Sequence, residues 1–256
     1  RLPNKVMMKI NGAPMIELLF NRLSKSKNIN QVVLATSNNE NNIPLIEHVK
    51  NLGYKVFSGD ENNVLDRYFH AAKLFEADTI VRITGDCPLV DSTLVDEVIK
   101  GFVDTNSDYA SNREPPTYPD GLDVEVISIK ALEDAQKNAQ EVFQREHVTP
   151  YIINSEVYKK FYLKNSKDLS AERWTVDEPE DFNVVQNIFN FFHPAIDFSW
   201  KEVVQLRERK PEVFSENQHL NRNEGASMGN GQKLWTRAKR IIPGGNMLLS
   251  KRSEMF

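Results

Sequence analysis

An aspartate in the first half of the chain has the sequence setting of a ligand site. Asp86 follows the β-rich run 79–83 and the pair Thr84-Gly85, and Pro88 prevents simple continuation of the strand. Such a strand end lies at the carboxyl edge of a sheet, where open α/β folds bind ligands. Gly85 permits close approach to the backbone, and a carboxylate there suits a divalent metal that carries a nucleotide phosphate. A tight turn with a surface aspartate explains the same residues equally well.

A second carboxylate and two cations strengthen the first interpretation. Asp177 ends a predicted strand at 172–176, and we expect it at the same sheet edge as Asp86. A magnesium ion that bridges nucleotide phosphates uses one or two protein carboxylates. Arg1 and Lys5 lie in a basic loop that we expect beside this edge, where cations would neutralise charge on a transferred phosphoryl group. As solvated residues near a terminus they would need no such role, so both interpretations remain open.

The predicted strand 121–127 carries two further acids on one face. Alternation of side chains along a strand places Asp123 and Glu125 on one side, opposite Leu122 and Val124. Two acids on one face either line a pocket or form a solvated surface. Their spacing does not decide between these alternatives.

The polar cluster Arg145, Glu146 and His147 begins a predicted helix that ends near Asn154. These residues either contact a ligand or only cap the helix and form ion pairs. No pair of histidines or cysteines has the spacing of zinc ligands, and no Gly-x-Ser-x-Gly or P-loop pattern occurs. Cys87 follows an acid, which disfavours a thiolate, so we interpret it as a small packing residue.

Composition limits the class of protein. A chain of 256 residues with 40% apolar content can bury one substantial core and a small second unit. The net charge of −4 lacks the basic character of a nucleic-acid binder, and no apolar run has the length of a membrane span. A single cysteine and the lack of a signal peptide favour a reducing cytoplasm. Because the first residue is Arg1, we expect the natural N-terminus to be missing.

Hydrophobic periodicity predicts alternating strands and helices, which indicates a doubly wound α/β sheet. The predicted strands are 31–37, 54–57, 79–83, 108–112, 121–127, 157–163 and 172–176. The predicted helices begin near residues 14, 44, 63, 92, 130, 145, 179 and 200. Polar composition predicts a linker over 209–230, and the pattern of residues 232–242 predicts a basic amphipathic helix.

Seven motifs follow one another along residues 1–208. They are Arg1-Leu-Pro-Asn-Lys-Val6, Ala35-Thr-Ser37, Gly59 with Asn63-Val-Leu-Asp-Arg67, Thr84-Gly-Asp-Cys-Pro88, Gly121-Leu-Asp-Val-Glu-Val126, Arg145-Glu-His-Val-Thr149 and Trp174-Thr-Val-Asp177. Together they resemble the cytidylyltransferases of the spore-coat polysaccharide type, which are relatives of the CMP-sialic acid and CMP-KDO synthetases.

The resemblance implies a Rossmann-like nucleotide-diphospho-sugar transferase fold, with a mostly parallel mixed sheet and helices on both faces. It implies binding of CTP with Mg²⁺, attack of an acceptor oxygen on the α-phosphorus and release of pyrophosphate, with a sugar acid as acceptor in surface polysaccharide synthesis. The implied catalytic residues are Arg1, Lys5 and Asp86, with Asp86 and Asp177 as metal ligands. The implied nucleotide-binding residues are Thr36, Ser37, Gly59, Asn63, Arg67, Thr84 and Gly85. The implied acceptor-binding residues are Asp123, Glu125, Arg145, Glu146 and His147.

The chain departs from the family at its start, because members begin with a strand and a small-residue, basic loop before the Arg-Leu-Pro motif. We therefore expect residues 1–208 to form a truncated domain that lacks its first strand and binds CTP weakly. Relatives are often dimers, so a homodimer is possible. Two alternatives remain: a nucleotide-binding module without catalysis, and a cytidylyltransferase that acts on a phosphate or phosphonate.

The end of the chain carries a separate resemblance. Residues 231–245, Gly231-Gln-Lys-Leu-Trp-Thr-Arg-Ala-Lys-Arg-Ile-Ile-Pro-Gly-Gly245, resemble the opening helix of glutamate-1-semialdehyde-type aminotransferases, which use pyridoxal phosphate. The resemblance predicts that residues 231–256 open a second domain of a bifunctional protein. The region of the catalytic lysine of such a domain is not part of this sequence.

Overall fold

The computed structural model describes residue 2 and residues 4–222, so Arg1, Pro3 and residues 223–256 lie outside the described part. The described α-helices are α1 (Met15–Leu23), α2 (Ile43–Asn51), α3 (Val64–Leu74), α4 (Ser92–Thr105), α5 (Ile129–Asn138), α6 (Val142–His147), α7 (Pro150–Ile153), α8 (Pro179–Phe192) and α9 (Trp200–Arg209). The described strands are β1 (Lys9–Ile10), β2 (Ala13–Pro14), β3 (Val33–Ser37), β4 (Lys55–Gly59), β5 (Thr79–Arg82), β6 (Tyr109–Ser111), β7 (Glu125–Ser128) and β8 (Lys160–Tyr162). Short 3₁₀-helices are η1 (Lys5–Met7), η2 (Glu40–Asn42) and η3 (Pro211–Phe214).

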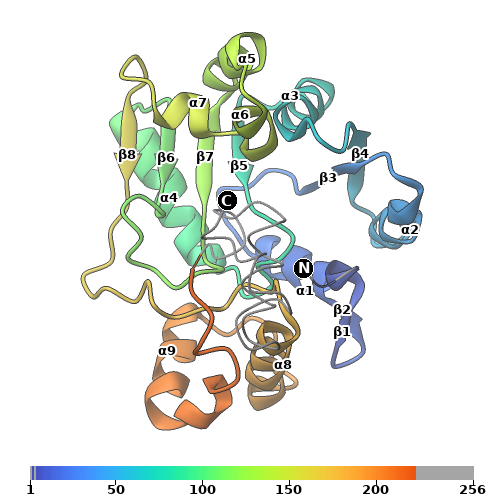
Figure 1. Ribbon diagram of the computed structural model, residues 1–256, viewed down its shortest axis with the longest axis vertical. Helices are drawn as coiled ribbons and strands as arrows, with labels where there is room; N and C mark the ends of the chain where they lie inside the picture. The colour runs from blue at the N-terminus through green and yellow to red at the C-terminus, as the bar shows by residue number, and fades with distance from the viewer. Residues whose placement is uncertain (1, 3, 223–256) are drawn as a thin grey trace, which may run out of the picture.

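The largest sheet has the strand order β5-β7-β6-β8 (Figure 1). Strand β7 runs antiparallel to both β5 and β6, whereas β6 and β8 are parallel. Strands β3 and β4 form a separate parallel pair, and β1 and β2 form a small antiparallel pair. The α/β prediction is confirmed. The prediction was a mostly parallel sheet, whereas three of the described strand pairs are antiparallel and two are parallel.

Helices cover both faces of the large sheet, as predicted. Adjacent residues of β7 point to opposite faces because side chains alternate along a strand. Val126 packs in one core cluster with residues of α1 and α4, and Ile127 packs in another with residues of α3, α5 and α7. In Figure 1, α4 passes behind the large sheet, and α5, α6 and α7 lie together near the top of the view.

A cavity of about 780 Å³ lies between the strand pair and the large sheet. Residues of both β3 and β5 line it, including Ala35 and Val81. Among the described residues no strand joins β3 to β5, and each has a single hydrogen-bonded neighbour. The expectation that the domain has a further, first strand stays a prediction.

The predicted strand at 172–176 is wrong. The segment makes only an isolated parallel bridge between Asp120 and Arg173. Its backbone bonds instead reach two loops, since the Trp174 N–H donates to the Asp120 carbonyl at 2.7 Å and the Val176 N–H to the Asp86 carbonyl at 2.9 Å. Trp174 and Val176 alternate because both face a third core formed with α8, α9 and η3, so alternation alone imitated a strand.

Three other boundaries differ from the predictions. Strand β7 begins at Glu125 rather than at Gly121, so Asp123 lies in the loop before the strand and not on a strand face shared with Glu125. Arg145, Glu146 and His147 end helix α6 rather than begin a helix, because Val148 has φ = 72° and α7 starts afresh at Pro150. The start of the predicted linker 209–230 is folded onto the domain, since η3 buries Phe214 to 2% exposure and Asn217 is 4% exposed. The rest of that linker and the aminotransferase-like residues 231–256 lie outside the described residues.

Replacing Gly121 by alanine tests how the 172–177 segment is positioned. Gly121 has φ = +104°, and a Cβ there would lie 2.5 Å from the backbone nitrogen of Thr175. We expect Gly121→Ala to lower the free energy of unfolding by about 2–5 kcal/mol, because backbone strain and a backbone clash add. Urea unfolding would measure the loss.

Gly12→Ala is the matched control. Gly12 has φ = +87°, but nothing lies within 4 Å of its Cβ position. We expect this variant to lose only about 1 kcal/mol, from the backbone conformation alone. Equal losses in the two variants would contradict a close approach of residues 121 and 175.

Candidate active site

The ammonium group of Lys5 lies between two carboxylates from distant parts of the chain. Its Nζ is 3.1 Å from Asp86 Oδ2 and 2.8 Å from Asp177 Oδ1, and it donates to the Val176 carbonyl at 2.6 Å. All three charged side chains are partly buried, with 16%, 26% and 27% exposure for Lys5, Asp86 and Asp177. The structure therefore brings together three residues that the sequence predicted to lie close.

Local structure explains the position of each of these groups. Lys5 is the first residue of η1, and the Leu2 N–H donates to the Asp177 carbonyl at 2.9 Å, which joins the start of the chain to this segment. Asp86 follows β5 in a turn closed by the Cys87 N–H and the Thr84 carbonyl. Asp177 lies two residues before α8, and the backbone hydrogen bonds of Trp174 and Val176, rather than sheet pairing, position the segment that carries it.

The charges of this cluster favour the ionised forms of Lys5 and Asp86. Burial lowers the pKa of Lys5, but the carboxylates of Asp86 and Asp177 raise it, and the pKa lies above its ordinary value. Burial raises the pKa of Asp86, but Lys5 and the Thr84 side chain lower it, and the pKa lies below its ordinary value. Burial raises the pKa of Cys87 well above its usual range, so its thiol stays protonated.

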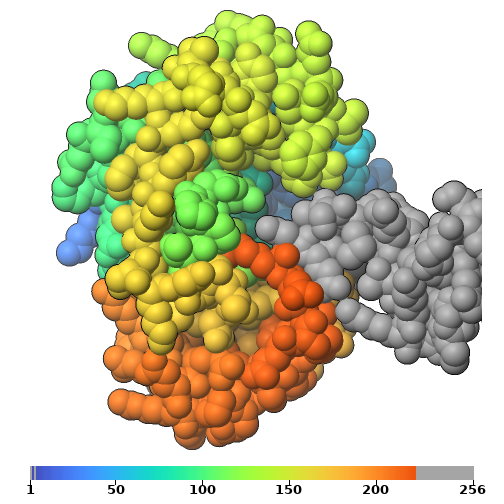
Figure 2. Space-filling model, turned by 60° about the vertical axis from the view of Figure 1, so that its left-hand side comes forward, coloured from blue at the N-terminus to red at the C-terminus, as the bar shows by residue number. Residues whose placement is uncertain are grey.

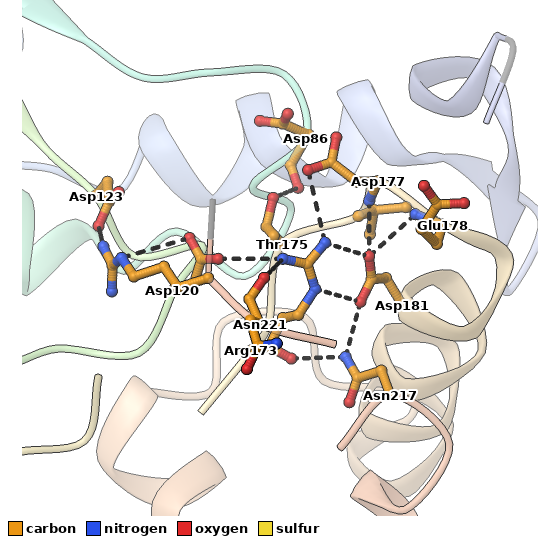
Figure 3. Close-up of polar contacts among 12 residues, drawn as sticks. Asp86, Asp120, Asp123, Arg173, Thr175, Asp177, Glu178, Asp181, Asn217 and Asn221 are labelled. Carbon is orange, nitrogen blue, oxygen red and sulfur yellow. Dashed lines mark hydrogen bonds and ion pairs between the residues drawn. The ribbon is translucent and has the colours of Figure 1, made fainter. Parts of the chain in front are cut away.

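Arg173 connects Asp177 to a second group of acids, as Figure 3 shows. Its guanidinium binds Asp181 through two nitrogens at 2.8 Å each. The same guanidinium lies 3.4 Å from Asp120 Oδ2 and 3.6 Å from Asp177 Oδ2. Arg173 therefore contacts the Asp177 side chain directly and also holds Asp181, which lies four residues further along the chain.

Asp181 is positioned by the start of α8. Pro179 occupies the first helical turn, and the Asp181 carboxylate accepts hydrogen bonds from the N–H groups of Asp177 and Glu178 at 3.0 Å each. Burial raises the pKa of Asp181, but the bonds from Arg173 and Asn217 lower it, and the pKa lies below its ordinary value. The helix start predicted from Pro179 and Asp181 is therefore also an anchor for the site.

The predicted nucleotide-binding residues gather at the ends of β3, β4 and α3. Ser37 and Gly59 are register partners, and Thr36 precedes Ser37 in β3. Asn63 caps α3 by accepting from the Asp66 N–H at 3.2 Å. Arg67 lies one helical turn further on, and its side chain passes 3.2 Å from the Cβ position of Gly59.

Two hollows meet beside the turn after β5. Arg67, Thr84 and Gly85 line the cavity between β3 and β5, and the buried Nε of Arg67 has no hydrogen-bond partner within the described residues. A second hollow of about 470 Å³ is lined by Lys5, Asp86 and Gly85, together with residues at the start of α2. Gly85 belongs to both hollows, so the two adjoin at this turn, whereas Thr36, Ser37, Gly59 and Asn63 line neither of them.

The predicted acceptor-binding residues fall into different surroundings. Glu125 is only 1% exposed and contacts Arg82 and Arg113. It also accepts hydrogen bonds from the hydroxyls of Tyr109 and Thr149 at 2.7 Å each. Thus the structure places Glu125 in the interior, where it orients two arginines.

Asp123, unlike Glu125, belongs to the group of acids around Asp120, because both pair with Arg222. Its carboxylate contacts Arg222, and its side chain is 26% exposed. Burial lowers the pKa of Arg113, but Glu125 and Asp123 raise it above its ordinary value. Arg145, Glu146 and His147 lie on α6, which packs against α3.

Sequence patterns missed several charged residues that organise the site. They are Arg82, Arg113, Asp120, Arg173 and Arg222. The five are scattered over loops and strand ends, and their partners come from distant segments. Arg82 lies in the predicted strand 79–83, but its register pairing with Glu125 is a non-local contact that the sequence alone does not determine.

The α/β fold, with Asp86 after β5 and Asp177 before α8 on one ammonium group, is that of a nucleotidyltransferase-like protein. A cytidylyltransferase from Leptospira borgpetersenii superposes with a TM-score of 0.80 at 30% identity, over 84% of this chain and 91% of that one. A sequence model described as cytidylyltransferase matches residues 1–219. The chain belongs to the cytidylyltransferase family and is a nucleotidyltransferase enzyme.

Curated relatives agree with this family. The spore coat polysaccharide biosynthesis protein SpsF of Bacillus subtilis is 31% identical over 84% of this chain and 92% of its own length. A 3-deoxy-manno-octulosonate cytidylyltransferase of Chloroherpeton thalassium is 25% identical over 63% of this chain and 65% of its own length. Among the described residues, no helix has the length and apolar character needed to cross a membrane.

Replacing Arg173 by methionine tests the anchor of Asp177. Asp181 is 0% exposed, so removal of its cation leaves a buried charge. We expect Arg173→Met to cost about 3–5 kcal/mol of unfolding free energy near neutral pH. Because the folded pKa of Asp181 is lowered, its stabilising pair is present above the unfolded pKa, near 3.8, and is lost as the pH falls through the folded pKa. Urea unfolding across this range would measure the loss.

Arg207→Met provides the comparison. Arg207 pairs with Glu172 at 3.2 Å, and both side chains are about one quarter exposed, at 27% and 26%. A pair exposed in this way contributes about 0–1 kcal/mol. A loss in Arg173→Met that is no greater than this, or that stays constant as the acids protonate, would contradict the proposed anchor.

Proposed function

We propose that this chain transfers CMP from CTP to a hydroxyl of a sugar acid and releases pyrophosphate. The observation that carries the proposal is the contact of Lys5 with Asp86 and Asp177 beside the Gly85 hollows. Family membership supports the use of CTP, and the octulosonate-specific relative supports a sugar acid as the acceptor class. The likeness to SpsF supports a role in surface polysaccharide synthesis.

Two carboxylates and a carbonyl around one ammonium form a donor set that suits magnesium. The Asp86 and Asp177 carboxylates and the Val176 carbonyl all lie within 3.1 Å of Lys5 Nζ, so hard oxygen ligands already converge on one cation. The described residues contain no cluster of three or more His, Cys, Asp or Glu side chains around a common point. Mg²⁺ bound to a nucleotide needs only one or two protein carboxylates. The residues present therefore fit the ion, which when bound would neutralise charge on the triphosphate.

The remaining roles follow from the positions of the protein groups. The acceptor oxygen forms a bond to the α-phosphorus, the bond to the bridging oxygen breaks, pyrophosphate leaves, and the hydroxyl proton passes to solvent. Lys5 lies where a cation can neutralise charge on the phosphates, and the family resemblance assigns Arg1, outside the described residues, to the same task. Thr36, Ser37, Gly59, Asn63, Arg67, Thr84 and Gly85 would contact the nucleotide. Asp123, Glu125, Arg145, Glu146 and His147 would form or support the acceptor side.

Pyrophosphate release by the protein in its full natural length tests the proposal. Each of the nucleoside triphosphates would be supplied with Mg²⁺ and a panel of sugar acids, including 3-deoxy-octulosonate. We expect release with CTP and at least one sugar acid, and a fall of at least about 100-fold in Asp86→Asn, because the charge that holds the metal is lost.

Asp104→Asn is the matched control for this assay. Asp104 is an exposed residue near the end of α4 and lines neither hollow. Its replacement is expected to leave turnover unchanged. Release with a phosphate or phosphonate acceptor alone would replace the sugar acid, whereas release that Asp86→Asn retains would refute the role of that carboxylate.

A second prediction concerns Lys5 and the metal. Lys5→Met removes the only cation within hydrogen-bond distance of both Asp86 and Asp177 among the described residues. We expect the variant to bind Mn²⁺ about 10-fold more tightly than the parent without nucleotide, because the ion no longer competes with the ammonium. Turnover of CTP should nevertheless fall. Electron paramagnetic resonance would measure free Mn²⁺.

Lys9→Met is the control for the metal titration. Lys9 is an exposed residue of β1, and its loss changes the net charge by the same amount. Its Mn²⁺ affinity should match that of the parent. If Lys5→Met also matches the parent, the two carboxylates are not the metal ligands.

A further inference from the structure

The chain beyond α9 folds back against the candidate active site. Phe214 packs beside Trp174, with ring centroids 6.4 Å apart. Asn217 donates to the Arg173 carbonyl and to Asp181 Oδ1 at 2.9 Å each. Arg173 in turn donates to the Asn221 carbonyl at 3.1 Å. In Figure 2 this last described segment runs upward across the face of the molecule from the α9 region. Residues 214–221 are therefore fixed next to the Arg173 anchor.

Arg222 ends this segment and binds two acids at once. Its Nη2 lies 2.5 Å from Asp123 Oδ1, and its Nε lies 4.0 Å from Asp120 Oδ1. Its Nη1 also donates to the Tyr118 carbonyl at 3.0 Å. The guanidinium is only 14% exposed, so its pairing with Asp123 and Asp120 is shielded from water.

The two acids adjoin the candidate metal ligands. Asp120 shares Arg173 with Asp177, and Asp177 shares Lys5 with Asp86. Burial raises the pKa of Asp120 to about 6, and the nearby Asp123 and Asp177 add to this effect while Arg222 and Arg173 oppose it. Arg222 is therefore separated from Asp177 by one carboxylate and one guanidinium.

The charge balance at this end of the site depends on Arg222. Arg173 is engaged by Asp181 through two nitrogens, so Arg222 is the main cation facing Asp120 and Asp123 together among the described residues. Without it, an anionic ligand entering beside Asp123 would meet the carboxylates of Asp123 and Asp120, while Arg173 pairs with Asp181 and Arg113 pairs with Glu125. Like charges at such distances repel strongly in a partly buried site.

We propose that Arg222 determines the charge of the acceptor that this enzyme accepts. By neutralising Asp120 and Asp123, it permits a sugar bearing a carboxylate to approach the metal ligands. The inference rests on the proposed transfer to a sugar acid and names the residue that would select this class. Arg222 lies beyond residue 219, where the family match ends, so the family motifs do not include it.

Steady-state kinetics of Arg222→Gln would test the assignment. The probes are a 2-keto-3-deoxy sugar acid and its carboxamide, which keeps the shape of the acid but removes its charge. We expect KM for the acid to rise at least about 10-fold, with kcat, KM for CTP and KM for the carboxamide within about twofold of the parent. Arg222→Lys retains the charge and should recover part of the affinity for the acid.

Arg209→Gln is the matched control. Arg209 is an exposed residue at the end of α9, and the variant loses the same charge. Its kinetics should equal those of the parent. A rise of KM for acid and carboxamide alike, without recovery in Arg222→Lys, would show that Arg222 only supports the fold and would overturn the assignment.

Calorimetric binding of the two probes separates the two proposals. A parent protein that binds the acid but never releases pyrophosphate overturns the proposed transfer alone. An Arg222→Gln variant that binds both probes with parental affinity overturns the assignment of Arg222 alone. Binding of the carboxamide in preference to the acid by the parent overturns the assignment as well.

Discussion

The structure depends on the neutralisation of acids that converge from distant segments. A row of alternating charges runs through the site: Asp86, Lys5, Asp177, Arg173, Asp120, Arg222 and Asp123. Partly buried carboxylates this close would otherwise repel one another or take up protons. Each cation is shared by two or more acids, so the loss of one affects both of its neighbours. The site is therefore one electrostatic unit rather than a set of separate pairs.

This unit also substitutes for secondary structure. Residues 173–177 lack a sheet partner apart from one bridge, yet Arg173, Trp174 and Val176 are all buried. Their positions are set by side-chain ion pairs and by bonds to the Asp86 and Asp120 carbonyls. Gly121 allows the segment to pass within van der Waals distance of the neighbouring loop. The metal ligand Asp177 proposed above thus owes its place to charge pairing and close packing.

The sequence predicted those features that local rules determine. Asn63 and Pro179 mark helix starts through capping and a fixed φ, and the strand before Asp86 ends where Gly85 and Pro88 require it. Non-local features were missed or wrong. Trp174 and Val176 alternate with polar residues as in a strand. They do so because both pack against the core formed by α8, α9 and η3, and not because the segment pairs with a sheet. Periodicity reports which residues are buried, but not which partner buries them.

The segment after α9 shows why composition is a weak guide to function. Polar residues are typical of a solvated linker because water satisfies their charges, but acids already buried in a fold can satisfy them too. Arg222 pairs with the acids Asp123 and Asp120, and Asn217 donates to Asp181. All three acids precede them by dozens of residues. Since the common reaction requires only metal, nucleotide and phosphate contacts, the matched motifs can be shared by enzymes with different acceptors. Under the proposal above, Arg222 lies outside those motifs and would set the charge of the acceptor side without altering the groups proposed for the transfer.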